Sequence, residues 1–123
     1  MVVMNPLVPE LLVSDLARSL HFYCQVLGFK IEYQRPEHQF AFLSFHGSQI
    51  MLEQDDRQAS TWRVAPLEAP FGRGMNLSIK CPDAQAISVC LQMAGHALRK
   101  PIEECWYRSH DRLFGERNFL VLD

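Results

Sequence analysis

The chain has 123 residues, of which 48% are hydrophobic and 21% are charged. This composition is typical of a globular domain with its own core, and it excludes an intrinsically disordered chain. The formal net charge is −2 and the lysines and arginines are scattered, so the basic patch of a nucleic-acid-binding protein is absent and we expect no nucleic-acid partner.

The N-terminal residues lack the charged and apolar regions of a secretory signal peptide. No apolar run approaches the length of a membrane span. We therefore expect a soluble, cytoplasmic protein that has no membrane partner. The cysteines form no C-x-x-C pair, and we expect free thiols that pack as small hydrophobic groups rather than disulfides. They are Cys24, Cys81, Cys90 and Cys105.

The first segments predict a strand followed by a helix. The strand covers Val8–Val13, and Ser14 and Asp15 then provide polar side chains that can accept hydrogen bonds from the first-turn amides of a helix. Gly28 is expected to end this helix, because glycine enters the left-handed cap conformation without steric cost. The helix has one apolar stripe at helical spacing. Its members are Leu16, Leu20, Tyr23 and Leu27.

Three strands are expected to follow this helix. The first covers Phe29–Gln34 and stops before Pro36, and the other two form a hairpin, Gln39–Phe45 and Gln49–Glu53. With Gly47 and Ser48 as the turn, His46 would face Gln49, Ser44 would face Met51 and Phe42 would face Glu53. Alternation then places an entirely apolar face toward the helix and a mixed face on the other side. The apolar face carries Leu43, Phe45, Ile50 and Leu52.

The second half predicts a similar series after a proline- and glycine-rich linker. A fifth strand covers Met75–Ile79, and Pro82 and Asp83 begin a second helix that Gly95 ends. Its apolar stripe consists of Ala84, Ile87, Leu91 and Ala94. Three further segments are expected: a strand that starts in His96–Arg99, an irregular connection over Pro101–Phe114, and a final strand over Arg117–Leu122.

The two halves share one order of signals: strand, polar cap with aspartate, helix, glycine stop and strand. The period between Asp15 and Asp83 is about 68 residues. This pattern predicts an α+β fold of two tandem β-α-β-β-β modules that form a curved, cup-shaped mixed sheet with helices on its convex face. We expect a single domain over residues 1–123, with module one at about 6–54, a linker at 55–73 and module two at 74–123. By the plan of module one, we expect one more strand in module two after Leu122, and either a longer chain or a partner chain would complete the sheet.

Several short segments resemble the vicinal oxygen chelate superfamily, also called the glyoxalase/bleomycin resistance protein/dioxygenase group. In the first half these segments are Pro9–Asp15, Ser19–Tyr23 and Val26–Phe29. In the second half they are Gly72–Leu77, Trp106–Arg108 and Gly115–Val121. The resemblance is greatest to the bleomycin-resistance-like proteins and covers nearly the whole chain. It implies that a Pro-Asp-Gly turn and a last strand would follow Asp123.

Enzymes of this superfamily hold a divalent metal with histidine and glutamate side chains on the concave sheet. The resemblance places Val8 and Gly74 where the two histidines would be. The glutamate position falls on Met51, or on Glu53 if the register slips by two residues. Valine and glycine offer no ligating side chain, so we expect neither a metal nor another cofactor.

The concave face is expected to be a small-ligand site, since it is apolar with a few polar groups. Ser44 and Ser78 should share this face, and the candidate ligand-binding residues on it are Glu10, Leu12, Phe42, Met51, Glu53 and Asn76. Phe42 and Met51 have a second interpretation as core-filling residues. Trp106, Tyr107 and Arg108 are expected in a loop that faces the ligand, although the aromatic rings could equally close the open end of the sheet.

These features favour a metal-independent binding protein, similar to bleomycin or glycopeptide resistance proteins that hold a drug without changing it. Its partner would be a small molecule, with a cationic or aromatic antibiotic as one candidate, because Glu103 and Glu104 add negative charge near the aromatic residues. The resemblance also implies a homodimer. The alternatives are a metal-dependent lyase, isomerase or dioxygenase, which would need the missing histidines, and a module that only mediates assembly.

Overall fold

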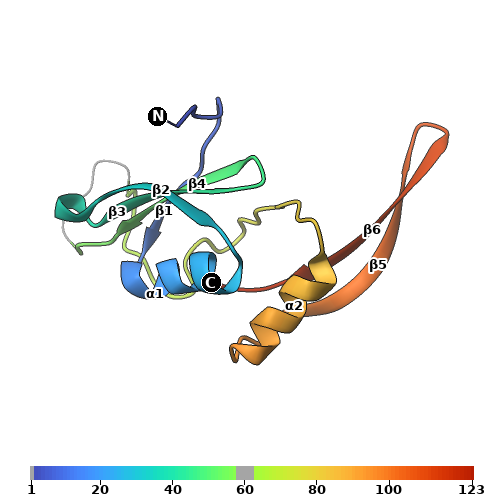
Figure 1. Ribbon diagram of the computed structural model, residues 1–123. Coiled ribbons are helices and arrows are strands. Elements are labelled where there is room, and N and C mark those ends of the chain that lie inside the picture. The colour runs from blue at the N-terminus through green and yellow to red at the C-terminus, as the bar shows by residue number, and fades with distance from the viewer. Residues whose placement is uncertain (1, 58–62) are drawn as a thin grey trace.

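A computed structural model describes residues 2–57 and 63–123. The fold is α+β, with a four-stranded mixed sheet, a helical layer on one of its faces and a two-stranded hairpin (Figure 1). The elements of the first half are β1 (Glu10–Val13), α1 (Leu16–Leu20), the π-helix η1 (His21–Val26), β2 (Lys30–Arg35), the 3-10 helix η2 (Pro36–His38), β3 (Phe40–Phe45) and β4 (Ser48–Gln54). Those of the second half are α2 (Ala84–Met93), β5 (Lys100–Ser109) and β6 (Arg112–Leu120).

The four-stranded sheet has the order β1-β4-β3-β2. β1 runs parallel to β4, and the other two pairs are antiparallel. The face that was predicted to meet the helix does so: its side chains belong to one buried cluster with Phe22 and Tyr23 of η1. The sheet residues of this cluster are Val13, Ala41, Leu43, Phe45, Ile50 and Leu52. Strand alternation therefore assigned the two faces correctly.

The register of the β3–β4 hairpin differs from the prediction. The turn residues are His46 and Gly47, both with positive φ (46° and 89°), and not Gly47 and Ser48. This left-handed pair is the arrangement that suits a two-residue hairpin, so Ser44 pairs with Gln49 and Phe42 pairs with Met51. Because the turn lies one residue earlier than predicted, each residue of β3 pairs with a residue of β4 two positions earlier than predicted. Each side chain consequently keeps its predicted face.

The first helix begins and ends as predicted, but its second part is a π-helix and not an α-helix. The Asp15 side chain accepts a hydrogen bond from the Arg18 amide at 3.2 Å, and Gly28 has a φ of 94°. Between them, η1 has the wider π turn, with a Leu27 amide to Phe22 carbonyl bond of 3.0 Å. The wider turn alters which positions face inward. The most buried helix residues are Ser19, Phe22 and Tyr23, and the predicted Leu16, Leu20 and Leu27 are half-buried.

The second helix repeats this pattern of capping. The Asp83 side chain accepts a hydrogen bond from the Ala86 amide at 3.0 Å, and Gly95 has a φ of 85°. In the predicted stripe, Leu91 is fully buried, Ala84 and Ile87 are half-buried and Ala94 is exposed.

The predicted strand over Met75–Ile79 is not present. This segment has no ladder partner in the described part of the chain. Leu77 and Ile79 nevertheless pack against the buried cluster. The alternation of apolar residues therefore predicted which side chains face the core. It could not predict whether another strand pairs with this segment.

The predictions for the last third of the chain also need correction. His96–Arg99 is not a strand, and the expected irregular connection over Pro101–Phe114 is instead occupied by β5 and the start of β6. The final strand begins at Arg112 and not at Arg117. Sequence reasoning missed this hairpin because His110 provides the positive φ of its turn (58°), where the expected signal is glycine or asparagine.

The linker predicted for residues 55–73 includes positions 58–62, Trp62 among them, which lie outside the described residues. The neighbouring residues 63–80 contain no regular helix or strand. Across the ranges that the structure describes, no helix is long and apolar enough to cross a membrane.

Candidate functional site

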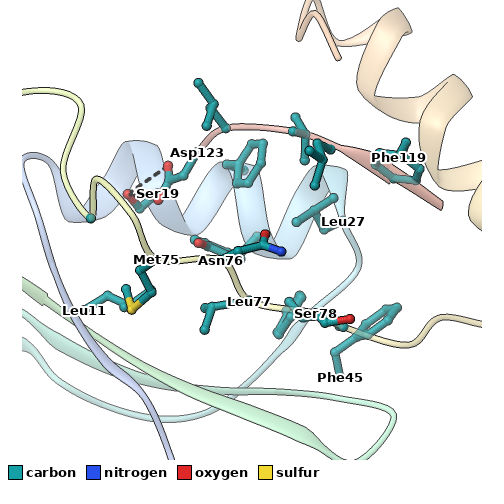
Figure 2. Close-up of a pocket in the computed structure, with 18 of the residues that line it drawn as sticks. Leu11, Ser19, Leu27, Phe45, Met75, Asn76, Leu77, Ser78, Phe119 and Asp123 are labelled. Atoms are coloured by element: carbon teal, nitrogen blue, oxygen red, sulfur yellow. Dashed lines mark hydrogen bonds between the residues drawn. The ribbon is translucent and has the colours of Figure 1, made fainter. Parts of the chain in front are cut away.

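A large cleft lies on the helical side of the sheet (Figure 2). Its volume is about 1860 Å³, and we call it the inner cleft. Its walls come from β1, the α1–η1 helix, residues 75–79, the start of α2, β6 and the segment that follows it, with further residues from the linker before residue 75. The apolar side chains of these walls include Leu11, Leu27, Phe45, Leu77 and Phe119, and charged side chains such as Arg18 and Arg117 stand among them. A concave, mainly apolar space with a few polar groups is the usual form of a small-molecule site.

Two polar residues of the inner cleft, far apart in the sequence, meet at its wall. The Ser19 hydroxyl donates to the Asp123 carboxylate, with oxygen–oxygen distances of 3.4 and 3.5 Å (Figure 2). The hydroxyl of Tyr23, which is 7% exposed, donates to the same carboxylate. Asn76 extends its amide into the middle of the cleft, beside Ser78 (Figure 2). The cleft therefore offers hydroxyl, amide and carboxylate groups to a bound molecule.

Burial is the main influence on the ionisation of Asp123 and Tyr23. It is the largest cause that raises the pKa of the Asp123 carboxyl, and it outweighs the hydrogen bonds from Ser19 and Tyr23 and the positive charges of Arg18 and His96. Burial also raises the pKa of Tyr23, and the negative charge of Asp123 raises it further. A carboxylate whose charge is disfavoured in this way gains from a positively charged partner.

Five of the predicted site residues do lie together on the other face of the sheet. In the pairing of β1 with β4, Glu10 lies opposite Met51 and Leu12 lies opposite Glu53. On the other side of β4, Phe42 of β3 lies opposite Met51. Burial, and then the charge of Glu53, raise the pKa of Glu10, so the two carboxylates are close enough to interact. Because β1 is an edge strand, Glu10 and Leu12 also reach the rim of the inner cleft.

Aromatic packing fills much of this second face. Phe42 is 0% exposed and stacks on Tyr33, with ring centroids 5.2 Å apart. The Arg35 guanidinium lies over Tyr33 and Phe40, at 5.4 and 5.1 Å from the ring centroids. These contacts agree with the core-filling interpretation of Phe42 that the sequence left open. Met51 and Glu53 are half-buried on the same face.

The remaining predicted residues are divided between the cleft and the hairpin. Asn76 and Tyr107 line the inner cleft, whereas Trp106 and Arg108 are not among its lining residues. All three residues of the predicted aromatic loop lie in β5, so the prediction of a loop was wrong. The Trp106 ring covers Gly115 across the hairpin, where an added Cβ atom would lie 2.7 Å from the ring. This contact gives Trp106 a structural role in the hairpin.

The expected negative charge of Glu103 and Glu104 is partly compensated. Glu103 forms an ion pair of 2.5 Å with Lys100, whose hydrogen bond lowers the pKa of this carboxyl. Glu104 pairs in register with Arg117. These two residues therefore provide less attraction for a cation than their sequence position suggested.

Sequence reasoning missed Ser19, Tyr23 and Asp123 as residues of a site. Ser19 had one available signal, because it is a polar residue on the inward side of a helix and is 5% exposed. Asp123 had none, since the contact between the end of the chain and α1 is created by the fold alone (Figure 1).

Comparison with known families identifies the superfamily of the chain. Residues 4–98 match the family model described as glyoxalase/bleomycin resistance protein/dioxygenase superfamily. The chain belongs to this superfamily. The match covers more than half of the chain and confirms the resemblance that the sequence segments indicated, while the nearness to its bleomycin-resistance branch stays a prediction. A search of curated protein sequences found no match.

Several solved structures share the fold. TioX from Micromonospora sp. ML1 is 16% identical, with coverage of 95% of this chain and 100% of TioX and a TM-score of 0.58. A superfamily member from Nocardioides is 19% identical over 98% of this chain and 87% of its own, with a TM-score of 0.60. The virulence protein STM3117 from Salmonella typhimurium is 19% identical over 95% and 98%, also with a TM-score of 0.60. At these identities the likeness establishes the fold alone.

The superfamily metal site does not fit the residues that the structure describes. In residues 2–57 and 63–123, no group of three or more histidine, cysteine, aspartate or glutamate side chains could hold a metal ion. Glu10 and Glu53 provide two nearby carboxylates on the sheet, but the positions that the resemblance assigns to histidine are Val8 and Gly74. Two carboxylates alone form an incomplete ligand set for a divalent transition metal.

Proposed function

We propose that this protein binds a small organic molecule in the inner cleft and holds it without a metal ion and without changing it chemically. The observation that carries this proposal is the cleft itself, with its volume of about 1860 Å³ and walls in which apolar side chains alternate with polar and charged ones. This volume exceeds the roughly 300–1,000 Å³ of most ligand pockets, so the proposal includes ligands larger than a typical metabolite.

An antibiotic is one ligand class within this proposal, because the superfamily includes bleomycin resistance proteins. Its glyoxalase and dioxygenase members define the competing activities. A metal-dependent reaction would require a ligand set that the described donor residues do not provide. Elemental analysis of purified protein separates the two: a stoichiometric amount of nickel, zinc, iron or manganese would contradict metal-free binding.

A thermal-shift screen tests the binding proposal. Glycopeptide antibiotics, common metabolites and divalent metals are each added to the purified chain. A ligand at 100 times its dissociation constant should stabilise the folded state by about 2.7 kcal/mol, through binding to the folded state alone. A screen in which only metal ions stabilise the protein would argue against the proposal.

A pair of variants then places a ligand from this screen in the inner cleft. Ser78 lines the cleft, whereas Ser109 lies at the end of β5 and does not. We expect Ser78→Trp to occupy part of the space and to weaken binding at least tenfold. The matched variant Ser109→Trp should leave binding unchanged. Equal affinities of the two variants would show that the ligand binds outside the cleft.

A further inference from the structure

The Asp123 carboxylate is an under-satisfied anion at the wall of the inner cleft. Its contacts with the Ser19 hydroxyl are 3.4 and 3.5 Å long, whereas hydrogen bonds between oxygen atoms are usually 2.5–3.0 Å. Among residues 2–57 and 63–123, no ion pair includes Asp123. The carboxylate therefore has room for a stronger partner that approaches from the cleft.

The charged and titratable neighbours of Asp123 come from two elements. Arg18 and Tyr23 belong to the α1–η1 helix, and His96 follows α2. Arg18 and His96 favour the ionised carboxylate through their charge, but neither side chain forms an ion pair with it. Ser19 and Tyr23 are themselves buried, at 5% and 7% exposure. The protein thus supplies hydroxyl donors beside the carboxylate but no cation that pairs with it. A bound molecule could supply that cation.

Apolar side chains line the same cleft as Asp123, although its wider rim also carries the cationic side chains of Arg63, Lys80, Lys100 and Arg117. Leu11, Leu27 and Leu77 line the same cleft, together with Phe45 and Phe119 (Figure 2). A molecule that reaches Asp123 would lie along these side chains, which would shield its methylene groups from water and so strengthen its binding. An anion and a long apolar wall in one cleft complement a molecule that has both a cationic end and an apolar body.

We propose that the inner cleft takes a cationic amphiphile, with an ammonium group paired to Asp123 and an apolar body along Leu11, Leu27 and Leu77. This inference rests on the proposed function, since it assigns a ligand class to the same cleft. The pair is a charge-assisted hydrogen bond in a partly buried place, where such bonds are stronger than neutral ones. Neutral and anionic analogues with the same apolar body bind more weakly.

Three probes with one apolar chain test the charge preference. Octylammonium, 1-octanol and octanoate are titrated into the full chain by calorimetry at pH 7, below their critical micelle concentrations. We expect octylammonium to bind about tenfold more tightly than octanol, and octanoate to bind most weakly. Equal binding of octylammonium and octanol would overturn the cation assignment and leave the proposed function standing. Failure of all three probes to bind would overturn the proposed ligand class, whereas the thermal-shift screen alone decides the proposed function.

A matched pair of variants assigns the preference to one carboxylate. Asp123→Asn retains the shape and the acceptor oxygen but removes the charge, and we expect it to bind octylammonium and octanol equally. Asp111→Asn, at the exposed end of the hairpin, should keep the tenfold preference. A preference that survives Asp123→Asn would overturn the assignment.

A measurement on the unmodified chain gives the same answer if Asp123→Asn does not fold. The ratio of octylammonium to octanol affinity is measured from pH 7 down to pH 3, which lies below the ordinary aspartate pKa of about 3.9. Protonation of the carboxyl removes its charge, so the ratio should fall toward one as the pH decreases. A ratio that stays constant over this range would exclude an ionised Asp123 as the partner of the cation.

Discussion

The ionisation of Asp123 makes the stability of the protein depend on pH. Burial raises the pKa of this carboxyl in the folded state, above the ordinary aspartate value of about 3.9. Between the two values the folded state holds more protons than the unfolded state, so the stability contribution of Asp123 decreases as the pH rises through this window. We expect chemical denaturation to show the wild type losing stability relative to Asp123→Asn as the pH rises from 4. A difference that grows in the opposite direction would contradict a raised pKa.

Trp106 shows how one side chain can have a structural explanation where a ligand role was expected. Its ring lies over Gly115 of the facing strand and is 64% exposed. We expect Trp106→Ala to lower the free energy of unfolding by about 1 kcal/mol, which is typical of a lost cross-strand contact. Affinity for a cleft ligand should stay within twofold of wild type, and Trp106→Phe should restore most of the stability. A large loss of affinity in Trp106→Ala would instead show that this ring contributes to ligand binding.

Each of the two main helices begins at an aspartate and is followed by a glycine with positive φ. Asp83 accepts a hydrogen bond from the Ala86 amide, as Asp15 does from the Arg18 amide. Removing such a cap costs about 1 kcal/mol, because a first-turn amide loses its partner. We expect this loss of unfolding free energy in Asp83→Ala, measured by urea denaturation. Asp111→Ala, in the turn of the hairpin, serves as the control and should change stability by less than half as much.

The elements were predictable to the extent that local chemistry determines them. Both helices and the β3–β4 hairpin have caps, glycine stops and alternation within a short stretch of sequence, and all three are present. The segment at Met75–Ile79 has alternation without a ladder partner, which no local signal can reveal. The β5–β6 hairpin has good strand residues, but His110 and not glycine or asparagine provides the positive φ of its turn, so the sequence carries no hairpin signal there.

The arrangement of the whole molecule explains why the site was harder to predict than the fold. Alternation correctly placed Glu10, Leu12, Met51 and Glu53 with Phe42 on one face. It gave no indication that the larger space would lie on the helical side, because that cleft depends on where residues 75–79 and the C-terminal segment lie. Asp123 joins Ser19 across almost the whole length of the sequence. Contacts of this kind follow from tertiary structure and not from any local pattern.

The proposed homodimer is a further property of the whole molecule. The β5–β6 hairpin projects from the body (Figure 1) and exposes Trp106, Tyr107, Leu113 and Phe114 by 51–64%. A two-stranded hairpin has little stability by itself, so a second copy that covers it would stabilise it. We expect light scattering at micromolar concentration to give the mass of a dimer. A monomer mass of 14.2 kDa would contradict this expectation.

The parallel pairing of β1 and β4 has a consequence for how the protein is made. β1 hydrogen-bonds only to β4 within the sheet, and Glu10 lies opposite Met51. On the ribosome, β1 emerges first and has to wait for its neighbour until the chain has been synthesised beyond Gln54. During this interval Leu11, Leu12 and Val13 lack their final packing, and an unpaired strand of this kind is prone to associate with other chains. Synthesis at high rate and high temperature should therefore favour inclusion bodies, and slower synthesis in the cold should favour recovery of folded protein.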